Sequence, residues 1–290
     1  MGIDIHAFNF IRMQSMKNGL GSTLTIGRQS LNVTSEFIRK QLNTEIGNGD
    51  GYCELLLKKL NATDVCSIDY SDYEKPTYIG DLNLPIDLPK EFDTVIDAGS
   101  LEHVFDTACA FKNLIKCCKV GGQIIHILPV NNLSGHGFWQ FSSDLMFSIY
   151  SSENGFSNTE VYYASGLDFS TWYKVPGIKP GTRVQLVSLE PILLLCVAKK
   201  IEVVDSIKAV QPYYLNAWAA HDVAALQNQK SVSKIWTFAK RRLRQRGSFV
   251  NLLRNAALIL GLVLGRSSYS IKSPRFKKVV VKDQFQGERE

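Results

Sequence analysis

The chain has 290 residues, of which 45% are hydrophobic and 21% are charged. This composition is ordinary for a globular protein and excludes intrinsic disorder, collagen and coiled-coil arrays. No apolar run reaches the roughly 18 residues that a membrane-spanning helix needs. The N-terminus lacks a basic cluster followed by an apolar stretch, so no secretory signal is predicted.

The net charge of +6 is distributed unevenly along the chain. Residues 1–204 contain 17 Lys and Arg against 22 Asp and Glu, whereas residues 205–290 contain 16 against 5. The first part therefore carries a net −5 and the second a net +11. We place a domain boundary here and expect residues 205–290 to form a basic helical extension. Such a segment either contacts an anionic partner or presents a solvated basic face.

Apolar periodicity and turn residues predict alternating helices and strands over the first 200 residues. In chain order the predicted elements are helix 5–18, strand 23–26, helix 35–43, helix 55–60, strand 65–68, strand 77–79, strand 92–96, helix 106–119, strand 123–128, helix 142–152, strand 161–164 and strand 192–198. Apolar strands that alternate with helices are typical of a mostly parallel sheet covered on both faces. We therefore predict a Rossmann-like α/β domain.

Signatures of several other protein classes are missing. The chain has neither a phosphate-binding Gly-x-x-x-x-Gly-Lys-Ser/Thr loop nor a Gly-x-Ser-x-Gly nucleophile elbow. The six cysteines include no Cys-x-x-Cys pair, and no Cys/His group has metal-ligand spacing, so no metal site is predicted. We interpret all six cysteines as reduced thiols of a cytosolic protein.

Acidic residues stand at the ends of three predicted strands, where an open parallel sheet binds its ligands. These residues are Asp69, Asp81 and Asp97. A carboxylate in this place can accept hydrogen bonds from both hydroxyls of a ribose. A single Asp there is more often a turn residue or a helix cap, but three in series favour a nucleoside site.

Residues 92–104, FDTVIDAGSLEHV, and residues 120–125, VGGQII, carry a more specific pattern. They resemble the fourth strand, helix and fifth strand of class I S-adenosylmethionine-dependent methyltransferases, and the resemblance covers about residues 20–200. It implies S-adenosylmethionine as cofactor and methyl transfer to a small-molecule or glycan-type acceptor. Asp69 matches the family's ribose-binding acid, and Asp81 with Leu82 matches the pair beside the adenine. The cofactor-binding residues predicted in this way are Gly27, Asp69, Asp81, Leu82, Asp97 and Gly99.

The first loop departs from the family pattern acid-x-Gly-x-Gly-x-Gly. Residues 25–30 read TIGRQS, so Thr25 replaces the acid and only Gly27 remains. We expect Arg28 and Gln29 to crowd or reshape the approach to the methionine part of the cofactor. The lost glycines favour a second hypothesis, a non-catalytic methyltransferase-fold protein that serves in binding or assembly. A Rossmann oxidoreductase is disfavoured because no Gly-x-Gly-x-x-Gly follows the first strand.

Residues 134–142, SGHGFWQFS, resemble a run that opens the helix after the fifth strand in a bacterial subgroup of these proteins. That run lies over the mouth of the site. His136 is therefore the candidate general base for an acceptor that loses a proton, and a structural loop histidine is the alternative. Phe138, Trp139 and Phe141 are expected to form either an apolar substrate wall or part of the core.

The basic extension has an amphipathic pattern. Residues 234–246 interleave Lys and Arg with apolar residues, and residues 249–264 are mostly apolar. A basic helix followed by an apolar one is typical of contact with a membrane surface. The alternative is a helical cap that packs on the sheet or on a second copy of the chain. We expect a cytoplasmic protein with peripheral contact to anionic membranes through residues 234–264 and no nucleic-acid partner.

Overall fold

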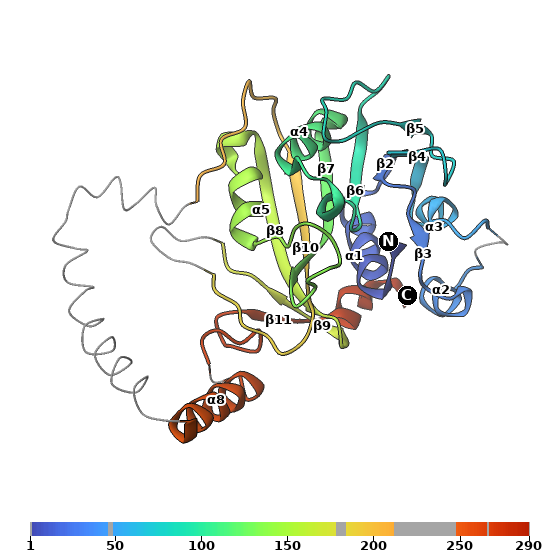
Figure 1. Cartoon of the computed structure of the whole chain (residues 1–290). Coiled ribbons are helices and arrows are strands. Elements are labelled where there is room, and N and C mark those ends of the chain that lie inside the picture. Colours follow the sequence, from blue (N-terminus) through green and yellow to red (C-terminus); the bar gives the residue numbers. More distant parts are fainter. Residues whose placement is uncertain (1, 46–48, 178–183, 212–247, 266, 290) are drawn as a thin grey trace.

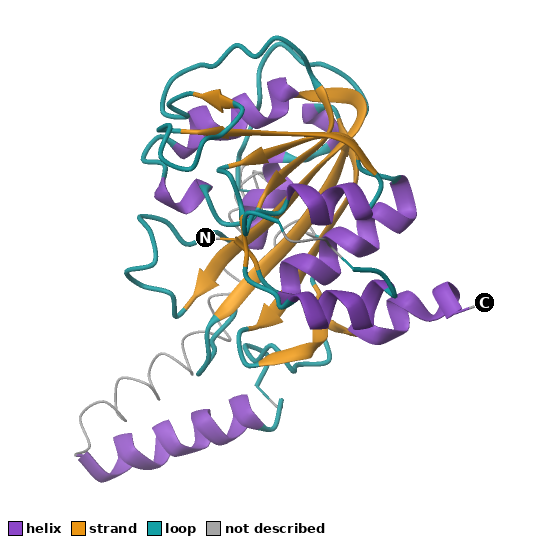
Figure 2. Ribbon diagram, turned by 90° about the vertical axis from the view of Figure 1, so that its right-hand side faces the viewer, coloured by secondary structure: helices purple, strands orange, loops and turns teal. Residues whose placement is uncertain are grey.

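The computed structural model describes residues 2–45, 49–177, 184–211, 248–265 and 267–289. These residues form a nine-stranded sheet with helices on both faces, as Figures 1 and 2 show. The strand order across the sheet is β11-β9-β8-β10-β7-β6-β2-β4-β5. In chain order the strands are β2 (Gly21–Ile26), β4 (Ala62–Asp69), β5 (Tyr78–Ile79), β6 (Phe92–Asp97), β7 (Cys118–Asn131), β8 (Phe156–Ser165), β9 (Asp168–Lys174), β10 (Ile192–Lys200) and β11 (Lys277–Val280).

Most strands of this sheet point the same way. The pairs from β5 across to β7 are parallel, whereas β10 is antiparallel to both β7 and β8. β9 is antiparallel to β8, and β11 is antiparallel to β9. Only β9 and β10 therefore oppose the other strands of the described sheet. The predicted mostly parallel α/β sheet is confirmed.

Two apolar layers hold the helices against the sheet. The helices on one face are α1 (Ile5–Asn18), α2 (Ser35–Leu42) and α3 (Glu54–Lys59), and those on the other are α4 (Thr107–Cys117) and α5 (Ser143–Ile149). Side chains alternate along a strand, so neighbouring residues of β7 enter different layers. Ile125 packs with α1, and Ile124 packs with α4. Burial of apolar surface on both faces stabilises the sheet that positions the site.

Short elements complete the described fold. They are β1 (Gly2–Ile3), which pairs in parallel with β3 (Ser30–Leu31), and the 3₁₀ helices η1 (Leu101–His103), η2 (Ser152–Asn154) and η3 (Val281–Arg289).

Helix α1 is joined to the sheet by polar contacts as well as apolar ones. Nε1 of the buried Trp172 donates to Nδ1 of His6 at 3.1 Å. The proton of His6 therefore lies on Nε2, which donates to the Ser165 carbonyl at 2.9 Å. These bonds tie the first helix to the β8–β9 hairpin.

The end of the basic extension returns to the sheet. β11 pairs with β9, and the guanidinium of Arg12 in α1 lies 4.2 Å from the centre of the Phe285 ring in η3. The segment 205–290 thus contributes a strand and a 3₁₀ helix besides helix α8 (Ser248–Val263). Its division from the first part near residue 205 stays a prediction, and residues 234–247 of the predicted membrane contact lie outside the described residues. No described helix is long and apolar enough to cross a membrane.

Each predicted helix and strand is present in the structure, with bounds that differ by a few residues, but the structure also contains strands and 3₁₀ helices that are not predicted. β9 and β11 were not predicted, and the predicted helix 142–152 ends earlier, because α5 stops at Ile149. The Gly121-Gly122 pair was predicted to precede a strand but lies inside β7. Gly121 has φ +87°, and a Cβ on Gly122 would lie 2.7 Å from the Asp93 carbonyl oxygen. This pair therefore permits the irregular start of the β6–β7 pairing.

Candidate functional site

A cavity of about 470 Å³ opens at the carboxyl ends of β2, β4 and β6. We call it the Asp69 cavity. Five of the six predicted cofactor-binding residues line it: Gly27, Asp69, Asp81, Leu82 and Gly99. Parallel strands of an open sheet bind ligands at this end.

Gly27 forms the turn at the floor of the Asp69 cavity. Its φ of +73° lies in the left-handed region, and its N–H donates to the Ile68 carbonyl at 2.7 Å. A Cβ at this position would lie 2.9 Å from Oγ of Ser100. The chain therefore needs glycine here for both its backbone angle and its close approach to Ser100.

Two carboxylates at the cavity, those of Asp69 and Asp81, are fixed by nearby N–H donors. Oδ1 of Asp69 accepts from Tyr70 N at 2.7 Å, and Oδ2 accepts from Arg28 N at 3.2 Å. Oδ1 of Asp81 accepts from the backbone and side-chain nitrogens of Asn83 at 2.9 and 2.7 Å. Each Asp69 oxygen retains a lone pair, so the carboxylate is held in place and can still accept from a ligand.

The side chains expected to crowd the first loop have partners of their own. Arg28 donates to Glu54 at 2.7 Å, and its guanidinium lies 4.0 Å from the centre of the Tyr52 ring. Gln29 folds beneath the loop, where its Nε2 donates to Oγ of Ser100 at 3.1 Å. Oε1 of Gln29 is buried and has no hydrogen-bond donor among the described residues. Gln29 therefore leaves one buried acceptor beneath the first loop without a donor in the described part of the chain.

Asp97 lies apart from the cavity lining. It is fully buried, and its Oδ2 is 2.8 Å from Nδ1 of His126. Its Oδ1 accepts from Ser100 N at 2.8 Å and from Leu101 N at 3.3 Å. Asp97 thus anchors the loop that follows β6, and the lining residue Gly99 belongs to that loop.

Glu102, His103 and His136 come together beside the cavity. His103 lines the Asp69 cavity, and Nε2 of the exposed His136 lies 3.8 Å from Oε1 of Glu102. Glu102 is fully buried, and neither carboxylate oxygen has a hydrogen-bond donor among the described residues. Burial and the nearby charge of Asp97 raise the pKa of Glu102 to about 8, and burial next to His136 lowers the pKa of His103.

No metal site was predicted, yet the donor atoms of these three residues all lie within 4.8 Å of one another. Sequence spacing could not have indicated this group, since His136 follows His103 at a distance of 33 residues.

The aromatic residues near His136 divide between surface and core. Phe105 and Phe138 are 73% and 69% exposed, and Trp139 is 41% exposed. The Phe105 ring centre lies 6.3 Å from each of the other two. Phe141 is buried and packs against Phe111. The first three residues therefore form an exposed aromatic group beside the histidines, and Phe141 belongs to the core.

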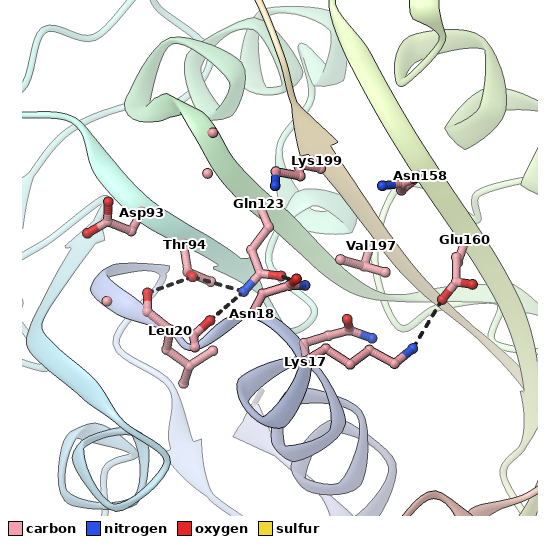
Figure 3. A pocket seen from close by; sticks show the side chains of 15 residues that line it. Lys17, Asn18, Leu20, Asp93, Thr94, Gln123, Asn158, Glu160, Val197 and Lys199 are labelled. Carbon is pink, nitrogen blue, oxygen red and sulfur yellow. Dashed lines mark hydrogen bonds and ion pairs between the residues drawn. The ribbon is translucent and has the colours of Figure 1, made fainter.

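Figure 3 shows the residues that line a second cavity. It has a volume of about 480 Å³ and lies at the opposite end of the strands from the Asp69 cavity. Its lining includes Asp93 at the start of β6 and Gln123 in β7. Nε2 of Gln123 donates to the Gly19 carbonyl at 2.9 Å, and Lys17 pairs with Glu160 at 3.5 Å. These polar groups bind one another, and this is not the end of a parallel sheet that binds ligands. The Asp69 cavity is therefore the stronger candidate site.

Comparison with known proteins yields distant structural likenesses only. No family model and no curated protein matches the sequence. The N-methyltransferase NodS from Bradyrhizobium japonicum, in complex with S-adenosyl-L-homocysteine, is 13% identical with a TM-score of 0.38 over 67% of this chain and 84% of that chain. TehB from Haemophilus influenzae is 12% identical with a TM-score of 0.39 over 65% and 61%.

The sugar N-methyltransferase KedS8 from Streptoalloteichus is 14% identical with a TM-score of 0.29 over 59% of both chains. Likeness at this level assigns no function, so the function of this chain has to follow from its own residues.

Proposed function

We propose that this chain is an S-adenosylmethionine-dependent methyltransferase that acts on a small-molecule or glycan-type acceptor. The observation that carries the proposal is the meeting of Gly27, Asp69, Asp81, Leu82 and Gly99 at one cavity. Its volume of about 470 Å³ falls within the range of sites that hold small ligands. The resemblance of residues 92–104 to the methyltransferase pattern supports the same function.

The residues of the Asp69 cavity fit a nucleoside cofactor. The Asp69 carboxylate retains acceptor capacity for ribose hydroxyls, while Asp81 and Leu82 offer a polar and an apolar contact for the base. The cofactor, when bound, supplies an electrophilic methyl group.

We propose that the acceptor lies beside His103, which lines the Asp69 cavity and whose ring centre is 5.8 Å from that of His136. His136 is exposed and can take a proton from a hydroxyl or amine held beside it. Phe105, Phe138 and Trp139 present ring surfaces to the apolar face of an acceptor. Correct placement of the nucleophile is the main contribution expected of the protein in such a displacement.

Calorimetric titration of the full chain with S-adenosylmethionine and S-adenosylhomocysteine tests the cofactor directly. Binding of both at micromolar concentrations is expected. Absence of binding up to millimolar concentrations would overturn the proposal and favour the non-catalytic alternative. For the base, His136→Ala is expected to lower turnover about 100-fold while cofactor affinity stays unchanged. Normal turnover in this variant would reduce His136 to a loop residue.

We also propose that the protein is cytoplasmic and that its basic extension makes a peripheral contact with anionic membranes. Residues 205–290 carry a net +11, and α8 ends in an exposed apolar surface. That surface consists of Leu258, Ile259, Leu260, Val263 and Leu264, each 47–58% exposed. Basic residues bind an anionic leaflet through a salt-sensitive attraction, and an apolar helix face adds a salt-resistant one.

Vesicle sedimentation tests this contact. Full-length protein is expected to sediment with anionic vesicles at low salt, to be partly released at high salt and to bind neutral vesicles poorly. Leu260→Glu should weaken the vesicle binding that remains at high salt. Leu189→Glu, the control at a site that is 61% exposed, should leave that binding unchanged. No sedimentation at low salt would overturn the proposal, and a shift in oligomeric state caused by Leu260→Glu would indicate contact with a second copy instead.

A further inference from the structure

We propose that Glu102, His103 and His136 form a binding site for one divalent transition-metal ion at the edge of the Asp69 cavity. One carboxylate and two imidazoles are a donor set that zinc and its first-row neighbours accept. Their donor atoms already lie within 4.8 Å of one another. Donors on one tetrahedral ion with bonds of about 2.1 Å lie about 3.4 Å apart, so rotation of the exposed histidine rings closes the site.

The state of Glu102 is the second observation that indicates a ligand. Its side chain is fully buried, yet both of its oxygens lack a hydrogen-bond donor among the described residues. A buried carboxylate in a native protein is normally paired, hydrogen-bonded or coordinated to a metal. The nearest histidine nitrogen, Nε2 of His136, is 3.8 Å away and therefore too distant for a hydrogen bond. A cation between these groups would complete the environment of Glu102.

The backbone holds the two halves of the site together. The Glu102 carbonyl accepts from Phe138 N at 2.7 Å and from Trp139 N at 3.3 Å. A Cβ at Gly137 would lie 2.7 Å from that carbonyl oxygen and from Cγ of Glu102. Only glycine allows the loop after β7 to approach Glu102 so closely. The loop that carries His136 is thus fixed to η1, which carries the other two donors.

Three protein donors leave a tetrahedral ion with one open position, as in catalytic zinc sites. His103 lines the Asp69 cavity, so the open position borders the space proposed for the acceptor. An oxygen of the acceptor, from a hydroxyl or phosphate group, is the ligand that this position would take. That last role depends on the proposed methyltransferase function, but metal binding by these three residues does not. A metal-bound His136 cannot also take a proton, so the role of general base proposed above for His136 applies to the metal-free chain, and metal binding would replace it.

Metal binding is measured on the full chain after treatment with a chelator, in the presence of a non-thiol reductant. Zinc is titrated in competition with a chromophoric chelator, and cobalt(II) is followed by its visible absorption. One ion per chain is expected, with a cobalt spectrum that lacks a sulfur-to-metal charge-transfer band. Glu102→Gln and His136→Ala should each weaken zinc binding about 100-fold or more, because each removes a ligand.

The controls address the other donors of the chain. His221→Ala removes another histidine, and Cys109→Ser removes a partly exposed thiol. Both should bind zinc as the native chain does. Unchanged zinc affinity in both Glu102→Gln and His136→Ala would overturn the proposal. If Glu102→Gln fails to fold, the zinc affinity of His136→Ala alone decides the test, because His136 is exposed. Because cofactor binding is measured separately and without metal, failure of one proposal does not imply failure of the other.

Discussion

Nδ1 of His126 lies 2.8 Å from Oδ2 of Asp97, and neither side chain is exposed to solvent. On its other side, Nε2 of His126 lies 2.6 Å from the hydroxyl of Tyr150 at the end of α5. The second oxygen of Asp97 receives the N–H groups of Ser100 and Leu101. One buried chain of polar groups therefore connects α5, two central strands and the loop that borders the Asp69 cavity.

The first prediction concerns this buried series of hydrogen-bonded side chains. Asp97→Ala removes a buried partner and leaves His126 and two backbone N–H groups without an acceptor. We expect the free energy of unfolding to fall by about 3–5 kcal/mol in urea denaturation. Asp87→Ala, which breaks only an exposed ion pair with Lys116, should cost about 1 kcal/mol or less. Similar losses in both variants would show that the Asp97–His126 pair is not a structural anchor.

The second prediction concerns the ribose contact. Asp69→Ala should weaken binding of S-adenosylhomocysteine about 10- to 100-fold, since a charge-assisted hydrogen bond is worth roughly 1.5–3 kcal/mol. Asp72→Ala, in the exposed loop after the same strand, serves as the matched control and should bind normally. Calorimetry of both variants makes the measurement. Equal affinity in the two would mean that the nucleoside does not contact Asp69.

The third prediction concerns the turn at Gly27. Alanine there meets both a positive φ and Oγ of Ser100, whereas alanine at Gly51 meets only a positive φ of +90°. Gly51→Ala should cost about 1–2 kcal/mol of unfolding free energy, and Gly27→Ala should cost more and also abolish cofactor binding. Denaturation and calorimetry compare the two. A Gly27→Ala protein that binds the cofactor normally would be inconsistent with this geometry.

The fourth prediction concerns pH and applies to the metal-free protein. The pKa of Glu102 is raised from 4.5 to about 8, so between these values the folded state keeps a proton that the unfolded state releases. The stability that this proton provides is complete below about pH 4.5 and is lost as the pH rises through 8. Native protein should therefore lose a few kcal/mol relative to Glu102→Gln between pH 5 and pH 9.

Urea unfolding in the presence of a chelator checks this dependence, with Glu153→Gln at an exposed position as the control. The unfolding free energy of this control should depend on pH as that of the native protein does. If the unfolding free energy of Glu102→Gln shows the same pH dependence as the native protein, the buried carboxyl does not titrate as described.

Much of the fold follows from local pattern. The apolar runs of β4, β6 and β10 and the helical spacing of α4 are strong signals, because their side chains are buried on regular periods. β11 gives no such signal, since it is a four-residue edge strand with two lysines. Its place beside β9 depends on pairing between residues about a hundred positions apart, and local pattern carries no information about that pairing.

The candidate site was predictable only where it follows strand ends. Gly27, Asp69 and Asp81 meet because parallel strands end at one edge of the sheet. Arg28 pairs with Glu54, which lies 26 residues further along the chain, and no sequence motif indicates this pair. The group formed by Glu102 and His136 depends in the same way on how two loops pack. These contacts are tertiary, and spacing along the chain does not encode them.

The bond between His6 and Trp172 has a consequence for synthesis of the protein. The two residues are 166 positions apart, and a ribosome adds about 5–20 residues per second. Helix α1 therefore emerges about 8 to 33 s before the hairpin that covers it. During that interval the Phe10 ring of α1 lacks Tyr162 and Trp172, the two rings on which it packs in the native protein. A nascent chain arrested before these residues should therefore bind chaperones that recognise exposed apolar side chains.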